Sequence, residues 1–80
     1  MRITVKYFGI IADFTQKKDE VFALNEDMNS IESLQFQLET VYPQIKNTKY
    51  ALALNQKLIH ENATLHNNDE IALLPPFAGG

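Results

Sequence analysis

The sequence predicts an α+β fold in which one main helix covers one face of a mixed five-stranded sheet. Five short segments show strand patterns, and one longer segment repeats apolar residues at helical spacing. A helix with a single apolar stripe most simply covers one face of a sheet. Eighty residues, 45% of them apolar, allow one small domain with a packed core. We therefore expect residues 1–80 to form a single domain.

The chain opens with two predicted strands. In residues 2–8 apolar residues alternate with polar ones, which indicates a strand with one buried face. Phe8 breaks the alternation and falls on the opposite face, where it either covers an edge of the core or makes an exposed contact. Gly9 ends this strand, and residues 10–14 could form a single helical turn. Residues 21–24 are the second strand, so the chain begins with a hairpin that has a wide connection.

The main helix follows. Its apolar stripe lies on one face of a 3.6-residue helix and consists of Ile31, Leu34, Leu38, Val41 and Tyr42. Ser30 can cap this helix, or Asn29 can, with Glu32 completing a capping box. Pro43 ends the helix, because the residue before a proline is pushed out of the α region. Residues 44–49 are then expected to form a loop.

Three more strands complete the sheet. Residues 50–54 and 57–60 are the third and fourth strands, joined by a two-residue turn at Asn55-Gln56. Asn67-Asn68 suits a turn with positive φ. Residues 70–74 are largely apolar, so we expect the fifth strand to be central and covered. A right-handed crossover would set the first and last strands side by side and parallel at the centre of the sheet. This arrangement is a ubiquitin-like β-grasp.

Composition excludes several classes of function. The absence of cysteine removes disulfides, thiolate metal sites and a cysteine nucleophile. A net charge of −3 argues against nucleic-acid binding. No apolar run approaches the roughly 18 residues of a membrane span, so we expect a cytoplasmic protein. His60 and His66 fall in different elements, and two ligands make a poor zinc site, so we expect no metal. Adjacent acidic residues such as Asp19-Glu20 are interpreted as solubilising turn charges.

The last six residues are the strongest candidate for chemistry. Pro75 and Pro76 restrict φ and favour an extended tail over residues 75–80, which also holds Phe77 and Ala78. Gly79 and Gly80 have no Cβ and can thread a narrow channel. The α-carboxylate of Gly80 is ionised at neutral pH. A frayed terminus is the alternative. By elimination, however, this tail is the only reactive candidate in the sequence.

An apolar patch is expected beside the tail. It would consist of Phe8, Leu58, Leu74 and Phe77, and we predict that it contacts a partner protein. Monomers rarely expose large contiguous apolar patches without a partner.

Several features of the sequence match a known family. They are Tyr7-Phe8 in the first strand, Ser-Ile-x-x-Leu at residues 30–34, Tyr42-Pro43, Ala-Leu-Asn55, and the terminal Asp-Glu-x-Ala-x-x-Pro-Pro-x-x-Gly-Gly. The whole chain therefore resembles the small subunit of molybdopterin synthase. Two departures accompany the match: Ala12-Asp13 stands where many relatives have a basic–acidic pair, and Leu74 stands where many have phenylalanine.

The resemblance implies a sulfur carrier of molybdenum cofactor biosynthesis that has no activity alone. Gly80 would be adenylated by a separate activating enzyme, which uses ATP, and then converted to a thiocarboxylate. The thiocarboxylate would donate sulfur to precursor Z (cyclic pyranopterin monophosphate) inside a heterotetramer with the large synthase subunit. On this interpretation residues 75–79 position Gly80, and the chain alone binds no cofactor.

Three other functions are also compatible with the sequence. A sulfur carrier of the thiamine pathway is also a β-grasp chain that ends in Gly-Gly. A ubiquitin-like modifier would join Gly80 to lysines through an isopeptide bond. A plain binding module would have an inert tail, and deleting Gly79 and Gly80 would leave its function intact.

Overall fold

A computed structural model describes residues 1–75 of the chain. The predicted tail residues Pro76, Phe77, Ala78, Gly79 and Gly80 lie outside the described residues. Five strands form one sheet in the order β2-β1-β5-β3-β4. Their bounds are β1 (Arg2–Tyr7), β2 (Asp19–Ala23), β3 (Ala51–Leu54), β4 (Lys57–Ile59) and β5 (Glu70–Leu74). The central strands β1 and β5 pair in parallel, and the other neighbouring strands pair antiparallel. The β-grasp prediction, with its parallel centre, is confirmed.

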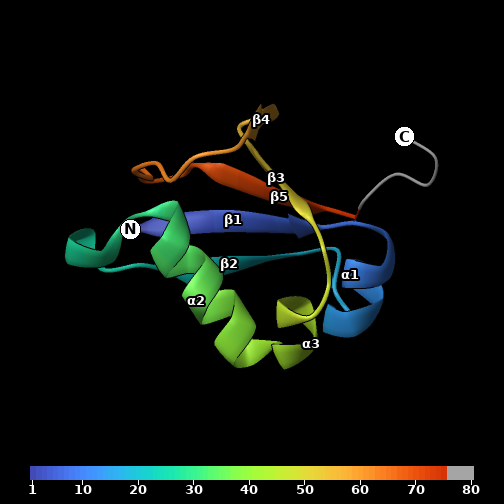
Figure 1. Ribbon diagram of the computed structural model, residues 1–80. Helices are drawn as coiled ribbons and strands as arrows, with labels where there is room; N and C mark the ends of the chain where they lie inside the picture. The colour runs from blue at the N-terminus through green and yellow to red at the C-terminus, as the bar shows by residue number, and fades with distance from the viewer. Residues whose placement is uncertain (76–80) are drawn as a thin grey trace.

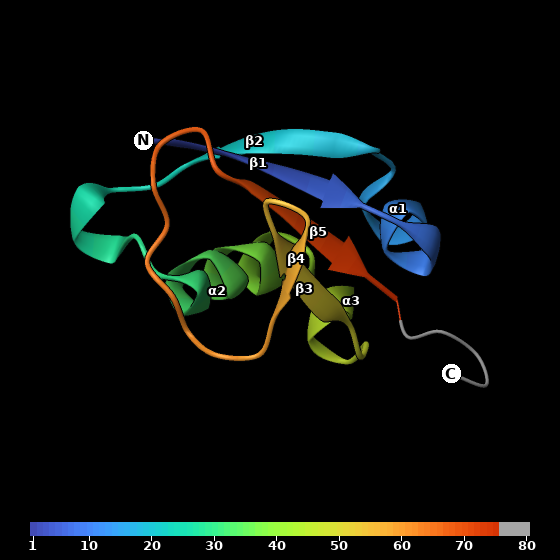
Figure 2. The same ribbon diagram turned by 90° about the horizontal axis from the view of Figure 1, so that it is seen from above.

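The helices are α1 (Gly9–Thr15), α2 (Ile31–Val41) and α3 (Pro43–Lys46), with a 3₁₀ turn at Glu26–Met28. Figure 1 shows α2 and α3 below the sheet and α1 at the end where β1 and β5 finish. Figure 2 shows the arrows of β1 and β5 running in the same direction toward α1. The single helical turn predicted after Gly9 is thus a helix of seven residues.

The core lies between the sheet and the helices. Its most deeply buried side chains come from β1, α1, α2, α3, β5 and the β4–β5 connection: Ile3, Val5, Ile11, Leu34, Leu38, Ile45, Leu65, Ile71 and Leu73. The alternation predicted for β1 is confirmed, because its buried and solvent-facing residues alternate along the strand. β5 is central, as predicted, but it is covered on one face only. Ala72 and Leu74 are half-buried and point away from the helices.

Ser30 caps α2, since its Oγ accepts a hydrogen bond from the Ser33 N–H at 3.1 Å. The capping box through Asn29 and Glu32 is therefore wrong. Pro43 does end α2, as predicted, because Tyr42 leaves the helical region with φ −125° and ψ 83°.

The loop predicted for residues 44–49 is also wrong in part. Pro43 occupies the first turn of α3, where a missing N–H costs no hydrogen bond. Ile45 of α3 is fully buried, whereas Val41 at the end of α2 is 55% exposed. Ile45 thus occupies the core beside the end of α2, and the prediction that Val41 belongs to the buried stripe is wrong.

The turns follow the predicted chemistry. Asn55 and Gln56 join β3 to β4, and both have positive φ, 48° and 72°. This is the backbone pattern of a type I′ hairpin turn, which favours the twist of the flanking strands. Asn68 also has positive φ, 71°, just before β5.

Candidate functional site

The candidate site begins where β5 ends. β1 and β5 finish side by side, with Tyr7 opposite Leu73 in the parallel register. Beyond that pair, Phe8 remains extended and Gly9 turns the chain into α1 with φ +57°. The half-buried Pro75, the last described residue, lies against Gly9. A Cβ built on Gly9 would come within 2.8 Å of Pro75 Cγ, so the proline ring occupies the space that a side chain would need.

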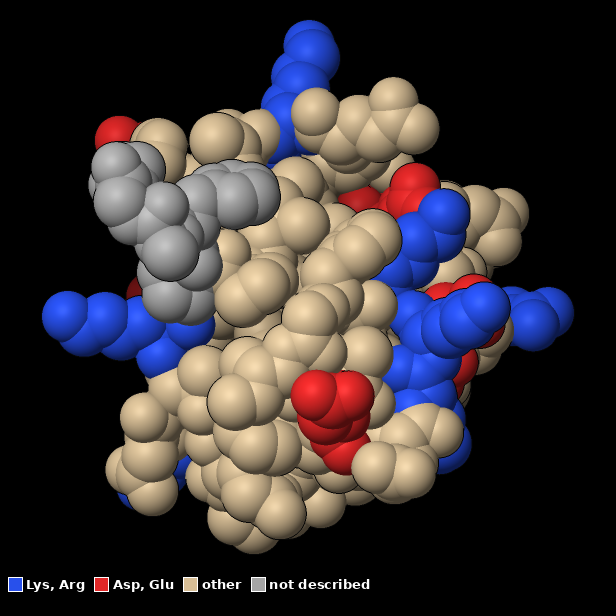
Figure 3. Space-filling view, turned by 90° about the vertical axis from the view of Figure 1, so that its right-hand side faces the viewer, with Lys and Arg blue, Asp and Glu red and all other residues tan. Residues whose placement is uncertain are grey.

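The surface around this end of the sheet carries little charge at its centre. Figure 3 looks onto this end and shows mostly uncharged residues in the middle, with Lys and Arg mainly at the sides. Phe8 and Ile10, at the start of α1, are 44% and 50% exposed. Such a surface suits apolar contacts with another protein.

The predicted contact residues share the open face of the sheet. Directly paired residues on neighbouring strands point to the same side, and so do alternate residues along a strand. Leu58 pairs with Ala53, and Ala53 pairs with Ala72. Leu74 follows Ala72 by two residues, and by the same alternation Phe8 lies on this face. The structure therefore brings Phe8, Leu58 and Leu74 to one face, opposite the helices, while Phe77 lies outside the described residues.

A small pocket of about 160 Å³ lies on this open face. Ala53 and Ala72 line it together with Phe8, and their small side chains leave the space open. Lys6 and Glu70 also line the pocket and form an ion pair at 2.7 Å. The hydrogen bond and charge of Glu70 raise the pKa of Lys6. The face thus combines apolar side chains with one partnered pair of charges, which sequence patterns did not reveal.

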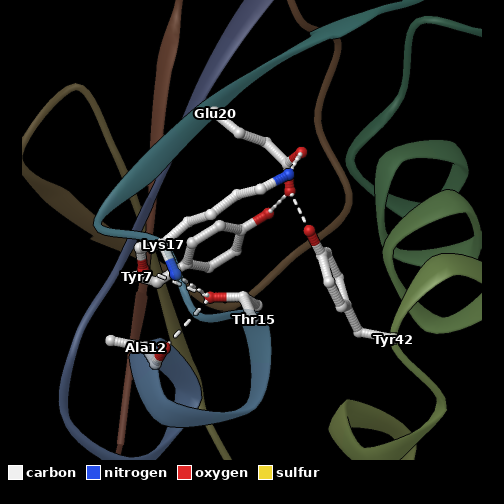
Figure 4. Close-up of polar contacts among 6 residues, drawn as sticks. All are labelled: Tyr7, Ala12, Thr15, Lys17, Glu20 and Tyr42. Atoms are coloured by element: carbon white, nitrogen blue, oxygen red, sulfur yellow. Dashed lines mark hydrogen bonds and ion pairs between the residues drawn. The ribbon is translucent and has the colours of Figure 1, made fainter.

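A second cluster fixes the neighbouring part of the sheet. The Glu20 carboxylate accepts hydrogen bonds from the hydroxyls of Tyr7 and Tyr42, both at 2.6 Å to Oε1, and Lys17 Nζ lies 2.9 Å from Oε2 (Figure 4). The two tyrosine rings meet edge to face with centroids 6.0 Å apart. Glu20 belongs to β2, and its side chain is only 20% exposed. The interpretation of Glu20 as a solubilising turn charge is therefore wrong.

Charge and burial shift the pKa values in this cluster. Burial raises the pKa of Glu20, but the hydrogen bonds from Tyr42, Tyr7 and Lys17 outweigh burial and lower it. Burial, together with the hydrogen bond to Glu20, raises the pKa of Tyr7 and of Tyr42. These shifts keep Glu20 ionised and both tyrosines neutral at neutral pH. The cluster therefore ties β1, β2 and the end of α2 together and has a structural role.

A larger pocket of about 660 Å³ lies between α2 and the β3–β4 side of the molecule. Polar groups along it are used within the fold. The Glu32 N–H donates to Asn62 Oδ1 at 3.0 Å, and Gln35 Nε2 donates to the Tyr50 hydroxyl at 3.1 Å. We assign this pocket no ligand.

Histidines and acidic residues do not form a metal-binding group within residues 1–75. His66 Nδ1 lies 3.8 Å from Asp69 Oδ2, in the turn before β5. Among the same residues, no helix has the length and apolar character needed to cross a membrane.

Comparison with known proteins connects this geometry to a family. A family model described as the ThiS family matches residues 5–80, which is nearly the whole chain and includes Gly79 and Gly80. The chain belongs to the ThiS family. This ThiS family member is 38% identical over 68 residues to a molybdopterin synthase sulfur carrier subunit from Dictyostelium discoideum, a match that covers 79% of each chain. The predicted family resemblance is thereby confirmed.

Solved structures show the same fold. One chain of a complex between subunits 1 and 2 of molybdopterin-converting factor from Helicobacter pylori 26695 is 29% identical to this chain. The match has a TM-score of 0.74 and covers both chains completely. Small archaeal modifier protein 1 from Haloferax volcanii is 15% identical, with a TM-score of 0.81, and the match covers 95% of this chain and 98% of that one. The second likeness bears on the fold alone, which is the ubiquitin-like β-grasp.

Sequence reasoning missed two residues of this region. Gly9 was interpreted only as the end of a strand, although a glycine between a strand and a helix is a signal for positive φ. Glu20 had no such signal, because its two tyrosine partners are 13 and 22 residues away in the chain. Ala12, one of the departures from the family pattern, packs against the core from α1, while Asp13 is exposed.

Proposed function

We propose that this chain is a sulfur carrier and the small subunit of a molybdopterin synthase. The observation that carries the proposal is the 38% identity to a sulfur carrier subunit of that enzyme. The family match supports it further, because the match continues through Gly80. The thiamine-pathway alternative receives less support, since the relative at 38% identity is named for molybdopterin synthase.

Gly80 is the reacting residue in this proposal, with its α-carboxylate as the chain terminus. A carboxylate is a poor electrophile, so it must first be activated. On a separate activating enzyme, a carboxylate oxygen attacks the α-phosphorus of ATP and pyrophosphate leaves, which yields an acyl-adenylate. Sulfide then attacks the carbonyl carbon and AMP leaves, so that a thiocarboxylate replaces the carboxylate. This chain binds no cofactor of its own and has no activity alone.

The folded domain carries the C-terminal tail and binds the large synthase subunit. Five residues follow Pro75, and they can span at most about 18 Å, at roughly 3.3–3.6 Å each. Gly79 and Gly80 lack side chains and fit a narrow channel in a partner. The open face, with Phe8, Leu58 and Leu74, docks the large synthase subunit, which places the thiocarboxylate beside precursor Z. The Helicobacter pylori complex of subunits 1 and 2 supports a large-subunit partner.

The thiocarboxylate is the sulfur donor inside the synthase complex. Its ionised sulfur is a strong nucleophile: it attacks a carbon of precursor Z and displaces the oxygen bonded there, so that a thioester joins Gly80 to the substrate. Water then cleaves this thioester, which leaves the sulfur on the substrate as a thiol and regenerates the Gly80 carboxylate. The carrier is then ready for another round of activation. Each turnover thus consumes one ATP on the activating enzyme and delivers one sulfur atom to the synthase.

The test is chemical and uses the full chain. We expect the chain to gain the mass of one sulfur in place of one oxygen when it is mixed with the activating enzyme, ATP and sulfide. Addition of the large subunit and precursor Z should then yield molybdopterin. Deleting Gly80, or appending one alanine after it, should abolish both results without changing the melting temperature. A residue adds over 3 Å, while about 1 Å of misplacement can already lower a rate a hundredfold.

Three results would contradict the proposal. One is molybdopterin formation by the appended-alanine variant without trimming back to Gly80. Another is isopeptide conjugates between Gly80 and lysines of other proteins in the native host, together with no thiocarboxylate, which would support a modifier instead. A carrier that supports thiazole synthesis and not molybdopterin synthesis would support the thiamine pathway.

A further inference from the structure

Gly9 and Pro75 meet at the point where the last strand leaves the domain. Gly9 has φ +57°, a backbone conformation that residues with a side chain rarely adopt. The nearest atom to a Cβ at this position would be Pro75 Cγ at 2.8 Å, followed by Pro75 Cβ at 3.6 Å and Cδ at 3.7 Å. All three atoms belong to one ring. The ring of Pro75 therefore lies directly over the bare Cα of Gly9.

Within residues 1–75, this contact is made by the last residue that the structure describes. The β1–β5 register ends at the pair Tyr7–Leu73, and Pro75 has no N–H with which to continue a ladder. The contact between the Pro75 ring and Gly9 thus holds the chain next to β1 where the pairing of β5 with β1 has ended. Any side chain on residue 9 must displace the ring by about 0.6 Å to restore ordinary contact at 3.4 Å. Such a shift changes the direction in which the chain leaves Pro75.

We propose that Gly9 is a positioning residue, which seats the Pro75 ring and so sets the direction in which the C-terminal segment leaves the domain. The inference rests on the proposed sulfur-carrier function. A second proline follows Pro75 in the sequence. Because each proline ring restricts φ, the chain has little freedom to compensate for a change of direction at Pro75. Because about 1 Å of misplacement at a reacting atom can lower a rate a hundredfold, a shifted ring lowers the rate of adenylation at Gly80.

Three variants distinguish a change in the direction of the C-terminal segment from a loss of folding stability. Gly9→Asn keeps the backbone, because asparagine tolerates positive φ, but its Cβ collides with the ring. Pro75→Ala removes Cγ and Cδ and introduces no collision, so it folds even where Gly9→Asn does not. Gln16→Val is the matched control: Gln16 lies at the other end of α1 with φ 59°, and valine strains that backbone without approaching Pro75.

The measurements are steady-state thiocarboxylate formation with the activating enzyme, ATP and sulfide, by mass, and nuclear Overhauser contacts between Gly9 Hα and the Pro75 ring. We expect Gly9→Asn and Pro75→Ala to lower the maximum rate at least tenfold per folded molecule. The carrier concentration for half-saturation should change less than threefold, because both substitutions lie at the Gly9–Pro75 contact and leave the rest of the domain surface unchanged. Gln16→Val should match the wild type in both parameters, and the Gly9–Pro75 contacts should be present in the wild type and lost in both test variants.

Several outcomes would overturn the inference while the proposed function stands. One is a wild-type maximum rate in both Gly9→Asn and Pro75→Ala. Another is a raised half-saturation with an unchanged maximum rate, which would assign Gly9 to docking. A third is the absence of the Gly9–Pro75 contacts in the wild type. A wild-type chain that gains no sulfur would instead overturn the proposed function, and the inference with it.

Discussion

Replacing Tyr7 with phenylalanine removes one hydroxyl from a buried ring and leaves the apolar packing in place. The hydroxyl donates to Glu20 Oε1 at 2.6 Å, and Tyr7 is only 3% exposed. A hydrogen bond to a charged partner contributes about 1.5–3 kcal/mol. We expect Tyr7→Phe to lower the free energy of unfolding by that amount at pH 7. For a domain of this size, the melting temperature should fall by roughly 6–24 °C.

The loss should depend on pH, because the acceptor is a carboxylate. Burial raises the pKa of Glu20, but hydrogen bonds from both tyrosines and Lys17 outweigh it and hold the folded-state pKa below the ordinary 4.5. Such a group stabilises the fold above its unfolded pKa and loses this contribution as the pH falls through its folded pKa. The difference between the wild type and Tyr7→Phe should therefore be full above about pH 4.5 and shrink below it.

Urea unfolding followed by circular dichroism at several pH values measures both effects. Tyr50→Phe is the matched control, because the Tyr50 hydroxyl accepts a neutral hydrogen bond from Gln35 at 3.1 Å. The control should lose only about 0.5–1.5 kcal/mol at pH 7. The reasoning fails if Tyr7→Phe loses no more stability than Tyr50→Phe at pH 7, or if its deficit grows on acidification.

Three further predictions concern the core, the open face and a turn. Leu38→Ala should lower the free energy of unfolding by about 2–5 kcal/mol because Leu38 is fully buried, while Val41→Ala on the same helix should change it by less than about 0.5 kcal/mol; equal urea midpoints would contradict this. Leu58→Ala should weaken binding to the large subunit by more than about 1 kcal/mol in calorimetry, whereas Phe36→Ala, 71% exposed on α2, should not; the reverse order would place the interface on the helix face. Gln56→Gly should raise stability by up to about 1 kcal/mol, because glycine tolerates its φ of 72°; a lower melting temperature would show that the turn is not strained.

The candidate site could be predicted only in part. The tail from Pro75 to Gly80 was named from its prolines and glycines, since their backbone properties do not depend on distant residues. Phe8 was assigned to the face opposite the core because it breaks the alternation of β1, and it is 44% exposed there. That Leu58 lies on the same face depends on the strand order, since β4 reaches β1 only through β3 and β5.

By itself the sequence determined the elements whose signals are local. Alternation in β1, helical spacing in α2 and the Asn55-Gln56 turn each arise within a few residues, because side-chain direction repeats every two residues in a strand and every 3.6 in a helix. A cap such as Ser30 is equally local, although its exact residue was one of two choices.

Only the tertiary structure decided which groups become buried at the ends of elements and between them. Val41 lies at the edge of the helical stripe, and it is exposed because α3 brings Ile45 into the core at the end of α2. Glu20 appears in the sequence as one of two adjacent acids in a charged stretch, and it is held between Tyr7 and Tyr42 only when β2 pairs with β1. Gly9 meets Pro75 in the same way, across 66 residues of chain, because the parallel pairing of β1 with β5 ends both strands at one place. In each case, a residue's environment depends on partners that are distant in sequence, and local patterns contain no information about them.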